Sequence, residues 1–277
     1  MLVFITDKSR LERHFRLDPV LYAYCLGDLD EPWFSHCQWA GFYTATGNVA
    51  EDRHVQEVAL IFNHHDGSTL QAFAQSELLR EDIHLLAPLL TDTIHLHVND
   101  TRLIEPLLSE FQVESEPTAM IKMSCTRRPQ SIQDINDRQS GLKPVRLSSN
   151  DLSAARELYE LALPDAFVSA EFLDASPCFG VKIEDHLVSI GGCHVLSKVQ
   201  QVAVIGGVAT HPELQNKGLA RMVMHALLQE IPDDYLVCLN VAAENAAARH
   251  LYESLGFVKT HDYWEAGLLR KNSEQPS

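Results

Sequence analysis

Residues 206–220 have the types and spacing best suited to binding an anion; they read GGVATHPELQNKGLA. An apolar strand pattern leads into them, and an apolar helical pattern starts at Leu219. A turn between a strand and a helix start directs backbone N–H groups and the positive end of the helix dipole at one point. Gly218 permits a close approach of the backbone to a ligand, while Lys217 and Arg221 add positive charge. The segment therefore predicts a site for a phosphate or pyrophosphate.

A second run suited to chemistry lies further along the chain and reads NAAARHLYESLGF over residues 245–257. Asn245 and Tyr252 are about two helical turns apart, and Ala248 lies between them on the same face. One helix face would therefore carry an amide, a small gap and a phenol. Two structural alternatives remain open, because Asn245 can cap the helix and Tyr252 can pack in a core.

Together the two segments resemble the signatures of the GNAT superfamily of N-acyltransferases. The first has the spacing Gln-x-x-Gly-x-Ala after Val-x-Thr-x-Pro, and the second has Asn-x-x-Ala-x-x-x-Tyr followed by Gly-Phe. The resemblance implies that acetyl-CoA is the cosubstrate, with its pyrophosphate on the amides of residues 215–220 and its pantetheine arm along residues 208–210. The coenzyme-binding residues implied are Val208, Ala209, Thr210, Gln215, Asn216, Lys217, Gly218, Leu219, Ala220, Asn240 and Asn245.

The same resemblance implies direct attack of an amine on the thioester, without a metal. The backbone N–H near Val208 would bind the developing oxyanion, and Tyr252 would act as general acid toward the thiolate. The general base stays unresolved, because residues 199–208 contain no Asp or Glu. The open candidates are Glu213, Glu244, His194, His211 and an ordered water.

The surrounding pattern predicts an α+β protein whose C-terminal domain has the GNAT fold, a mixed and mostly antiparallel sheet with flanking helices. Residues 148–151 supply helix caps. The expected strands are 142–147, 178–183, 187–196, 199–210, 235–241, 257–259 and 263–269, and the expected helices are 152–162, 167–175, a helix from 219, and 245–254.

The front half predicts a second mixed α/β lobe in a similar order. The expected elements are helices at 9–15, 76–89 and 101–111, a segment at 19–29, and strands at 39–44, 55–62, 69–73, 93–98 and 119–125. Residues 73–77 take the place of the phosphate loop but have neither glycine nor a basic residue, so this lobe is expected to have lost coenzyme binding. The two-lobed layout resembles the glycine N-acyltransferase branch of the superfamily.

The expected domains are a degenerate GNAT-like lobe over residues 1–125, a polar linker over 126–141 and a catalytic domain over 142–277. The formal net charge of −16 opposes nucleic-acid binding. No apolar run is long enough for a membrane span and no secretory signal is recognised, so we expect a cytoplasmic protein. The six cysteines lack Cys-x-x-Cys spacing, which opposes a disulfide framework and a thiolate metal site.

The sequence thus predicts an N-acetyltransferase that acts on a primary amine of a small molecule, an amino acid or a peptide. The alternative from another class is a non-catalytic acyl-CoA sensing module with a regulatory front lobe. A dinucleotide-binding oxidoreductase is disfavoured, since the loop lacks Gly-x-Gly-x-x-Gly. The acceptor amine and the oligomeric state stay open.

Overall fold

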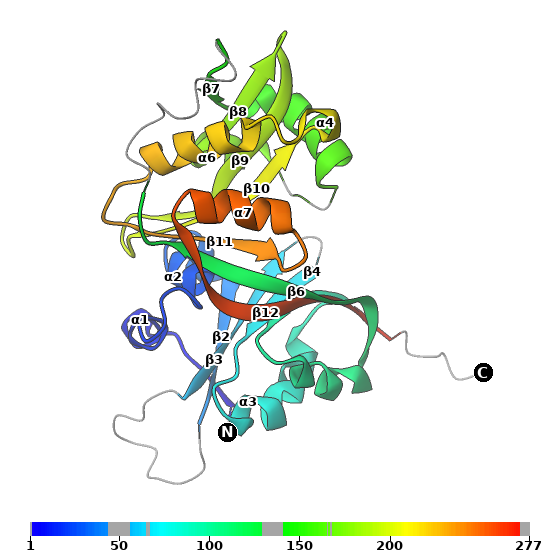
Figure 1. The fold of residues 1–277 in the computed structure, drawn as a ribbon. Helices are drawn as coiled ribbons and strands as arrows, with labels where there is room; N and C mark the ends of the chain where they lie inside the picture. The colour runs from blue at the N-terminus through cyan, green and yellow to red at the C-terminus, as the bar shows by residue number, and fades with distance from the viewer. Residues whose placement is uncertain are drawn as a thin grey trace, which may run out of the picture. The chain divides into compact units, whose positions relative to one another are not determined.

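The structure of the protein is a computed structural model that describes residues 2–43, 56–64, 67–128, 141–164, 166 and 168–271. The chain divides into two compact units that are not continuous in sequence (Figure 1). Unit 1 contains Met1–Ile121, Ala242–Glu244 and His261–Ser277, and unit 2 contains Lys122–Val241 and Asn245–Thr260. Most of the expected linker lies outside the described residues, and the expected boundaries at 125 and 142 stay predictions.

Unit 1 is built on a mixed sheet. Its strands are β1 (Leu2–Phe4), β2 (Cys37–Phe42), β3 (Glu57–His64), β4 (Gly67–Ala72), β5 (Thr93–Val98), the later part of β12 (Phe257–Arg270) and most of β6 (Phe111–Cys125), in the spatial order β1-β2-β3-β4-β5-β12-β6. Strands β4 and β5 are parallel, and the pairs from β1 to β4 and between β5 and β12 are antiparallel. Strand β1 was not predicted from the sequence.

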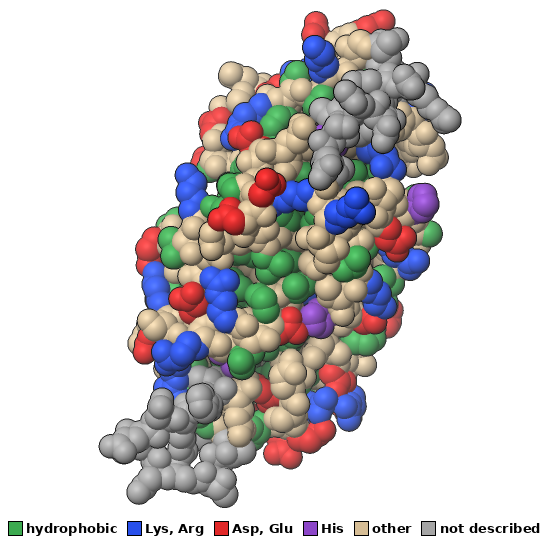
Figure 2. Space-filling view, turned by 60° about the vertical axis from the view of Figure 1, so that its left-hand side comes forward, with side chains coloured by type: hydrophobic (Ala, Val, Ile, Leu, Met, Phe, Trp, Pro, Cys, Tyr) green, Lys and Arg blue, Asp and Glu red, His purple; other side chains and the backbone are tan. Residues whose placement is uncertain are grey.

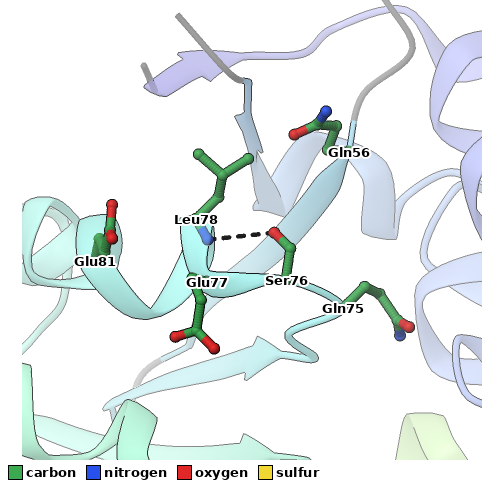
Figure 3. Close-up of a pocket in the computed structure, with 6 residues that line it drawn as sticks. All are labelled: Gln56, Gln75, Ser76, Glu77, Leu78 and Glu81. Carbon is green, nitrogen blue, oxygen red and sulfur yellow. Dashed lines mark hydrogen bonds between the residues drawn. The ribbon is translucent and has the colours of Figure 1, made fainter.

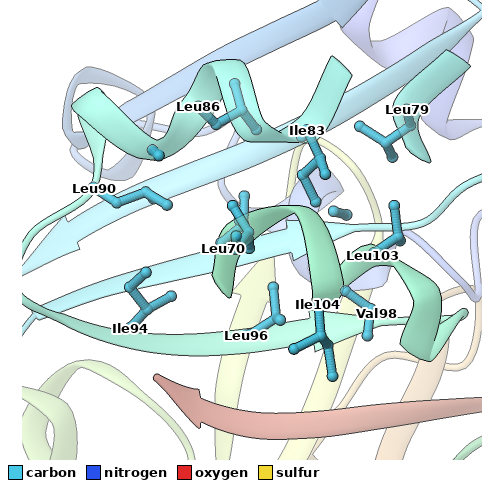
Figure 4. Close-up of a cluster of buried hydrophobic side chains, with 14 of the residues drawn as sticks. Leu70, Leu79, Ile83, Leu86, Leu90, Ile94, Leu96, Val98, Leu103 and Ile104 are labelled. Carbon is cyan, nitrogen blue, oxygen red and sulfur yellow. The ribbon is translucent and has the colours of Figure 1, made fainter. Parts of the chain in front are cut away.

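The helices of unit 1 are short. They are α1 (Lys8–Phe15), α2 (Ala23–Gly27), α3 (Glu77–Asp82) and the 3-10 segments η1 (Trp33–His36), η2 (Ile83–Leu89), η3 (Thr101–Leu103) and η4 (Glu105–Ser109). Segments α3 to η4 cover one sheet face with a cluster of buried aliphatic side chains that includes Leu70, Ile83, Leu96 and Leu103 (Figure 4).

Two helix predictions in unit 1 were wrong in extent or type. The helix expected over 76–89 is α-helical only to Asp82 and continues as η2, which contains Pro88. The helix expected over 101–111 is two 3-10 turns, the second of which has Pro106 at its start. Proline lacks the N–H that an α-helical interior requires, so it favours these shorter turns.

Unit 2 repeats the same order of elements. Its strands are β7 (Pro144–Arg146), β8 (Cys178–Ile183), β9 (His186–Ser197), β10 (Val202–Thr210) and β11 (Leu236–Ala242), joined by the ends of β6 and β12. Strands β7 to β10 pair in antiparallel neighbours, whereas β10 and β11 are parallel. The mixed sheet with flanking helices confirms the predicted fold class.

Helices cover both faces of the unit 2 strands (Figure 1). They are α4 (Leu152–Ala162), α5 (Ala170–Ala175), α6 (Leu219–Glu230) and α7 (Ala246–Ser254), with the short turns η5 (Ser149–Asp151) and η6 (Pro212–Leu214). Helices α4 and α5 pack on Ile190 and Ala209. A side chain at Gly191, the next position on β9, would contact Val223 and Leu227 of α6 instead. Alternation along β9 therefore separates the two helix layers.

The caps expected at residues 148–151 form at the start of η5, where the Ser148 backbone N–H donates to the Asp151 carboxylate at 2.9 Å. This turn leads into α4, whose own N-cap residue, Asp151, makes no side-chain cap in the described structure. The helix expected from residue 167 begins at Ala170, and Phe167 lies outside the described residues. The two strands expected at 257–259 and 263–269 form the single strand β12. At its polar middle the Thr260 hydroxyl donates to the Lys122 carbonyl at 2.9 Å.

The described residues also show the surface charge, the state of the cysteines and the polarity of the helices. On the face shown in Figure 2, acidic and basic side chains are mixed. No disulfide joins the six cysteines, all of which are described, and most of them are buried. Among the described helices, none is both long enough and apolar enough to cross a membrane.

Gly256 allows two backbone segments of unit 2 to meet. Its φ is +89°, and a Cβ there would lie only 1.8 Å from the Arg127 carbonyl oxygen. The Gly256 carbonyl in turn accepts from the Thr126 backbone N–H at 3.0 Å. The glycine of the Gly-Phe pair is therefore required both by its conformation and by a close backbone approach.

We expect Gly256→Ala to reduce the free energy of unfolding by about 3 kcal/mol, because both the backbone conformation and the Arg127 carbonyl must yield. Gly218→Ala is the matched control: its φ is +80°, but nothing lies within 4 Å of the added Cβ. We expect that control to lose only about 1 kcal/mol. Urea denaturation of both variants measures the difference, and equal losses would refute the role of the backbone contact.

Candidate functional site

Strand β10 separates from β11 halfway along its length. The pairs run from Val202 with Leu236 to Ile205 with Leu239, and in the described chain residues 206–210 have no partner on β11. On the other side β10 stays attached to β9, where the Ser189 hydroxyl donates to the Ala209 carbonyl at 3.0 Å. The separation leaves one backbone edge of β10 open to a ligand.

A β-bulge lies at the point of separation. Gly206 pairs with Gly192 and Ala209 with Ile190, so two residues of β10 face one residue of β9. Gly207 has a φ of +59°, and its carbonyl accepts from the Tyr159 hydroxyl at 2.8 Å. Burial raises the pKa of Tyr159, which keeps this hydroxyl protonated as a donor. Sequence reasoning missed Tyr159, although the glycine doublet in a strand was a signal for a bulge.

The loop after β10 leads to an uncapped helix start. Asn216 and Gly218 have positive φ values of 61° and 80°, and within the described residues no side chain caps α6. The first helical bond runs from the Met222 N–H to the Gly218 carbonyl at 3.2 Å. The N–H groups of Leu219, Ala220 and Arg221 therefore have no partner within the helix. This arrangement suits an anion. Gly218 provides the positive φ that the turn needs, and nothing lies within 4 Å of the place where its Cβ would be.

The structure brings the first group of predicted residues to this part of unit 2. Val208, Ala209 and Thr210 lie on β10, and Gln215, Asn216 and Lys217 are exposed in the loop before α6. Asn240 lies on β11 one residue beyond its last pair with β10. The structure thus locates these residues, and their contacts with a coenzyme remain predictions.

The second group lies on α7. The Asn245 carboxamide accepts from the Ala248 N–H at 3.0 Å, so this residue is the helix N-cap that the sequence left as an alternative. Tyr252 is 6% exposed and packs against Phe257 with ring centroids 6.1 Å apart. Desolvation raises the pKa of Tyr252 to about 12, so the phenol is neutral at pH 7 and retains a proton to donate.

The candidates for a general base are dispersed. Glu213 is exposed in η6, and the His211 ring accepts from the Glu213 N–H at 3.3 Å. Glu244 belongs to unit 1. His194 lies on β9 against Gly206. Across the described ranges, no group of three or more His, Cys, Asp or Glu side chains could hold a metal ion.

The counterpart of this loop in unit 1 is built differently. The fully buried Glu57 carboxylate accepts from the backbone N–H groups of Gln75, Ser76 (2.6 Å) and Leu79 (2.8 Å) at the start of α3. The recess beside it has a volume of about 550 Å³ and is lined by Glu77 and Glu81 among others (Figure 3). A carboxylate of the protein itself thus occupies the position that an anion takes at an uncapped helix start.

Comparison with known proteins identifies the family of this site. Residues 145–257 match the acetyltransferase (GNAT) family, so this segment is a GNAT domain. The segment contains the bulge, the open strand edge and the uncapped start of α6. The predicted resemblance is therefore confirmed.

Two curated relatives match short segments. One is the [ribosomal protein bS18]-alanine N-acetyltransferase of Salmonella typhimurium, with 44% identity over 20% of this chain and 38% of the relative. The other is the L-amino acid N-acyltransferase MnaT of Escherichia coli, with 36% identity over 22% of this chain and 36% of the relative. The chain thus spans little more than a third of the length of either relative.

Solved structures also resemble the chain over its whole length. One is a tandem GNAT protein from the clavulanic acid biosynthesis pathway, with 13% identity, a TM-score of 0.56 and full coverage of both chains. At this identity the likeness concerns the fold alone.

We expect Glu57→Ala to reduce the free energy of unfolding by about 3 kcal/mol, because three backbone N–H groups lose a charged acceptor in a buried place. Glu81→Ala is the matched control, since Glu81 is exposed on α3 beside the same recess, and should change stability by at most about 0.5 kcal/mol. Urea denaturation measures both. A loss at Glu57 no larger than at Glu81 would contradict the capping role.

Proposed function

We propose that the protein is an acetyl-CoA-dependent N-acetyltransferase whose donor site lies in unit 2. The observation that carries the proposal is the uncapped start of α6 beside the strand edge that β10 exposes after Ile205. The helix start offers backbone donors to a pyrophosphate, and the strand edge offers donors and acceptors to an extended amide-bearing chain. Coenzyme A carries both groups in one molecule.

In this proposal the coenzyme replaces the missing strand neighbour of β10. The pyrophosphate binds the N–H groups of residues 215–220, with Lys217 adding charge. The pantetheine arm pairs with residues 208–210, and Asn240 and Asn245 complete the donor site. Because the bulge turns Gly207 and Val208 out of regular register, a backbone N–H near Val208 is available to the thioester oxygen.

The proposed acceptor is an α-amino group. The names of the two curated relatives support this choice, since one is a [ribosomal protein bS18]-alanine N-acetyltransferase and the other an L-amino acid N-acyltransferase. The amine attacks the thioester carbonyl carbon, and the tetrahedral intermediate expels the thiolate. Tyr252 acts as general acid toward that thiolate, which its neutral state at pH 7 permits.

We expect acetyl-CoA to bind the purified protein and Gly218→Glu to abolish that binding, because the added carboxylate would lie at the proposed pyrophosphate site. Gly218→Gln is the matched control for bulk and backbone strain, and it should keep measurable affinity, at least about tenfold above any left in the Glu variant, or about 1.4 kcal/mol. Isothermal titration measures all three proteins. Absence of binding by the wild type at millimolar acetyl-CoA would overturn the proposal.

We expect Tyr252→Phe to leave the Kd for acetyl-CoA unchanged and to lower kcat by about 10²-fold, the usual effect of removing a general acid. Free thiol release measures turnover with a panel of L-amino acids and an N-terminal alanine peptide. Because the pKa of Tyr252 is about 12, wild-type kcat should not decline through loss of this proton between pH 7 and 10. Equal loss of binding and turnover in the variant would remove Tyr252 from this role.

A non-catalytic acyl-CoA sensor is the second candidate, because β10 (Val202–Thr210) presents no carboxylate as a general base. Binding of acetyl-CoA without thiol release on the whole amine panel would favour this candidate over the enzyme.

A further inference from the structure

His194 lies at a second irregularity of the sheet, one strand away from the proposed donor site. Cys193 pairs with Ile205 and Val195 with Val204, so His194 is the extra residue of a bulge in β9. A bulge redirects the side chain that it carries and interrupts the regular alternation of the strand. Sequence periodicity alone could not place this ring, because the register shift is a property of the paired strands.

The His194 ring packs directly on the backbone of β10. A Cβ on Gly206 would lie 2.4 to 2.9 Å from three ring atoms, and one on Gly207 would lie 3.4 Å from Nε2. Phe172 of α5 holds the other side of the ring edge-on, with centroids 5.6 Å apart. The glycine doublet thus lets an imidazole sit beside the bulge that precedes Val208, and Phe172 fixes its orientation.

The environment of His194 leaves the imidazole open to reactants. The side chain is exposed, and no hydrogen bond to either ring nitrogen is found among the described residues. The surrounding protein disfavours the charged form and lowers the pKa of His194 below 6.5. The ring is therefore mostly neutral at pH 7, with one nitrogen able to accept a proton.

Three titratable groups lie on elements near this ring, namely Tyr159 on α4, Cys178 on β8 and Cys193 on β9. The Tyr159 hydroxyl donates to the Gly207 carbonyl, and burial raises its pKa. Burial also raises the pKa values of the Cys178 and Cys193 thiols to about 12. No charged neighbour contributes to the lower pKa of His194.

We propose that His194 is the catalytic base that takes a proton from the acceptor amine. The inference rests on the proposed function, which places the thioester carbonyl next to Val208, and on the position of the imidazole against Gly206 and Gly207. It assigns a residue to the step for which the sequence offered several candidates. It also places the amine on the face of β9 and β10 that α4 and α5 cover.

The amine nitrogen forms a bond to the thioester carbon, and one of its protons moves to a ring nitrogen of His194. The carbon–sulfur bond breaks, and the thiolate takes the Tyr252 proton. Imidazolium and phenolate then return to their neutral forms by proton exchange with solvent. The products are an amide and the free thiol of coenzyme A.

The other candidates from the sequence fit this step less well. His211 uses a ring nitrogen to accept from the Glu213 N–H, which fixes it to the turn η6. Glu213 is exposed beyond the end of β10 and not beside the bulge. His194 is the candidate whose ring contacts the residues that precede Val208.

The experiment compares His194→Gln, His194→Ala and the control His186→Gln, which changes an exposed histidine at the start of the same strand. We expect His194→Gln to lower kcat by about 10²-fold while the Kd for acetyl-CoA stays within about twofold. Added imidazole should restore turnover to His194→Ala in proportion to its neutral form and should not stimulate the wild type. His186→Gln should match the wild type.

The outcomes are distinguishable. Absence of acetyl-CoA binding or of turnover by the wild type overturns the proposed function and this inference with it. If the wild type is active, unchanged kcat in His194→Gln overturns the inference alone. Loss of acetyl-CoA binding in the His194 variants, or lost turnover that imidazole does not restore, would assign the residue a structural or positioning role and would also overturn it.

Discussion

The separation of β10 from β11 is the constraint on which the site depends. Two parallel strands that part after Ile205 leave backbone groups without strand partners, and each such group costs about 1–3 kcal/mol when it is buried without a partner. The opening therefore persists only if other contacts fix β10. Ser189 attaches its end to β9, and the Tyr159 hydroxyl holds the Gly207 carbonyl at the bulge. A ligand with its own backbone-like amides can then complete the sheet.

The start of α6, which follows β10, differs from the starts of several other helices in this chain. Helix α1 is capped by Asp7, α5 by Ser169 and α7 by Asn245. Helix α6 starts instead at Gly218 without a side-chain cap, although an N-cap side chain typically contributes about 1 kcal/mol. Its buried face, which includes Met222 and Val223, keeps the helix on the sheet in spite of that. Stability is thus supplied by packing, while the helix start stays available for an anion.

The sequence was most informative where local pattern decides the structure. The predicted bounds of β5, β8 and α4 match the structure, since each has a regular apolar period and clear end signals. The prediction failed where non-local pairing decides, as in the long strand β12 and the bulge at His194. The contact between Tyr159 and Gly207 joins distant parts of the chain, so no local pattern reports it. The motifs were therefore enough to predict a donor loop before α6, whereas the contacts that hold β10 at the bulge could be found only from the fold.

The helix that follows the parallel strand pair starts differently in the two units. In both, a strand of the parallel pair runs into a turn and a helix, yet in unit 1 the Glu57 carboxylate already accepts from the N–H groups at that turn. The sequence predicted loss of coenzyme binding there from the absence of glycine and lysine in residues 73–77. The structure adds a stronger reason, because a fully buried carboxylate competes with any anion from within the molecule. Restoring a glycine and a lysine to that loop would leave this competitor in place.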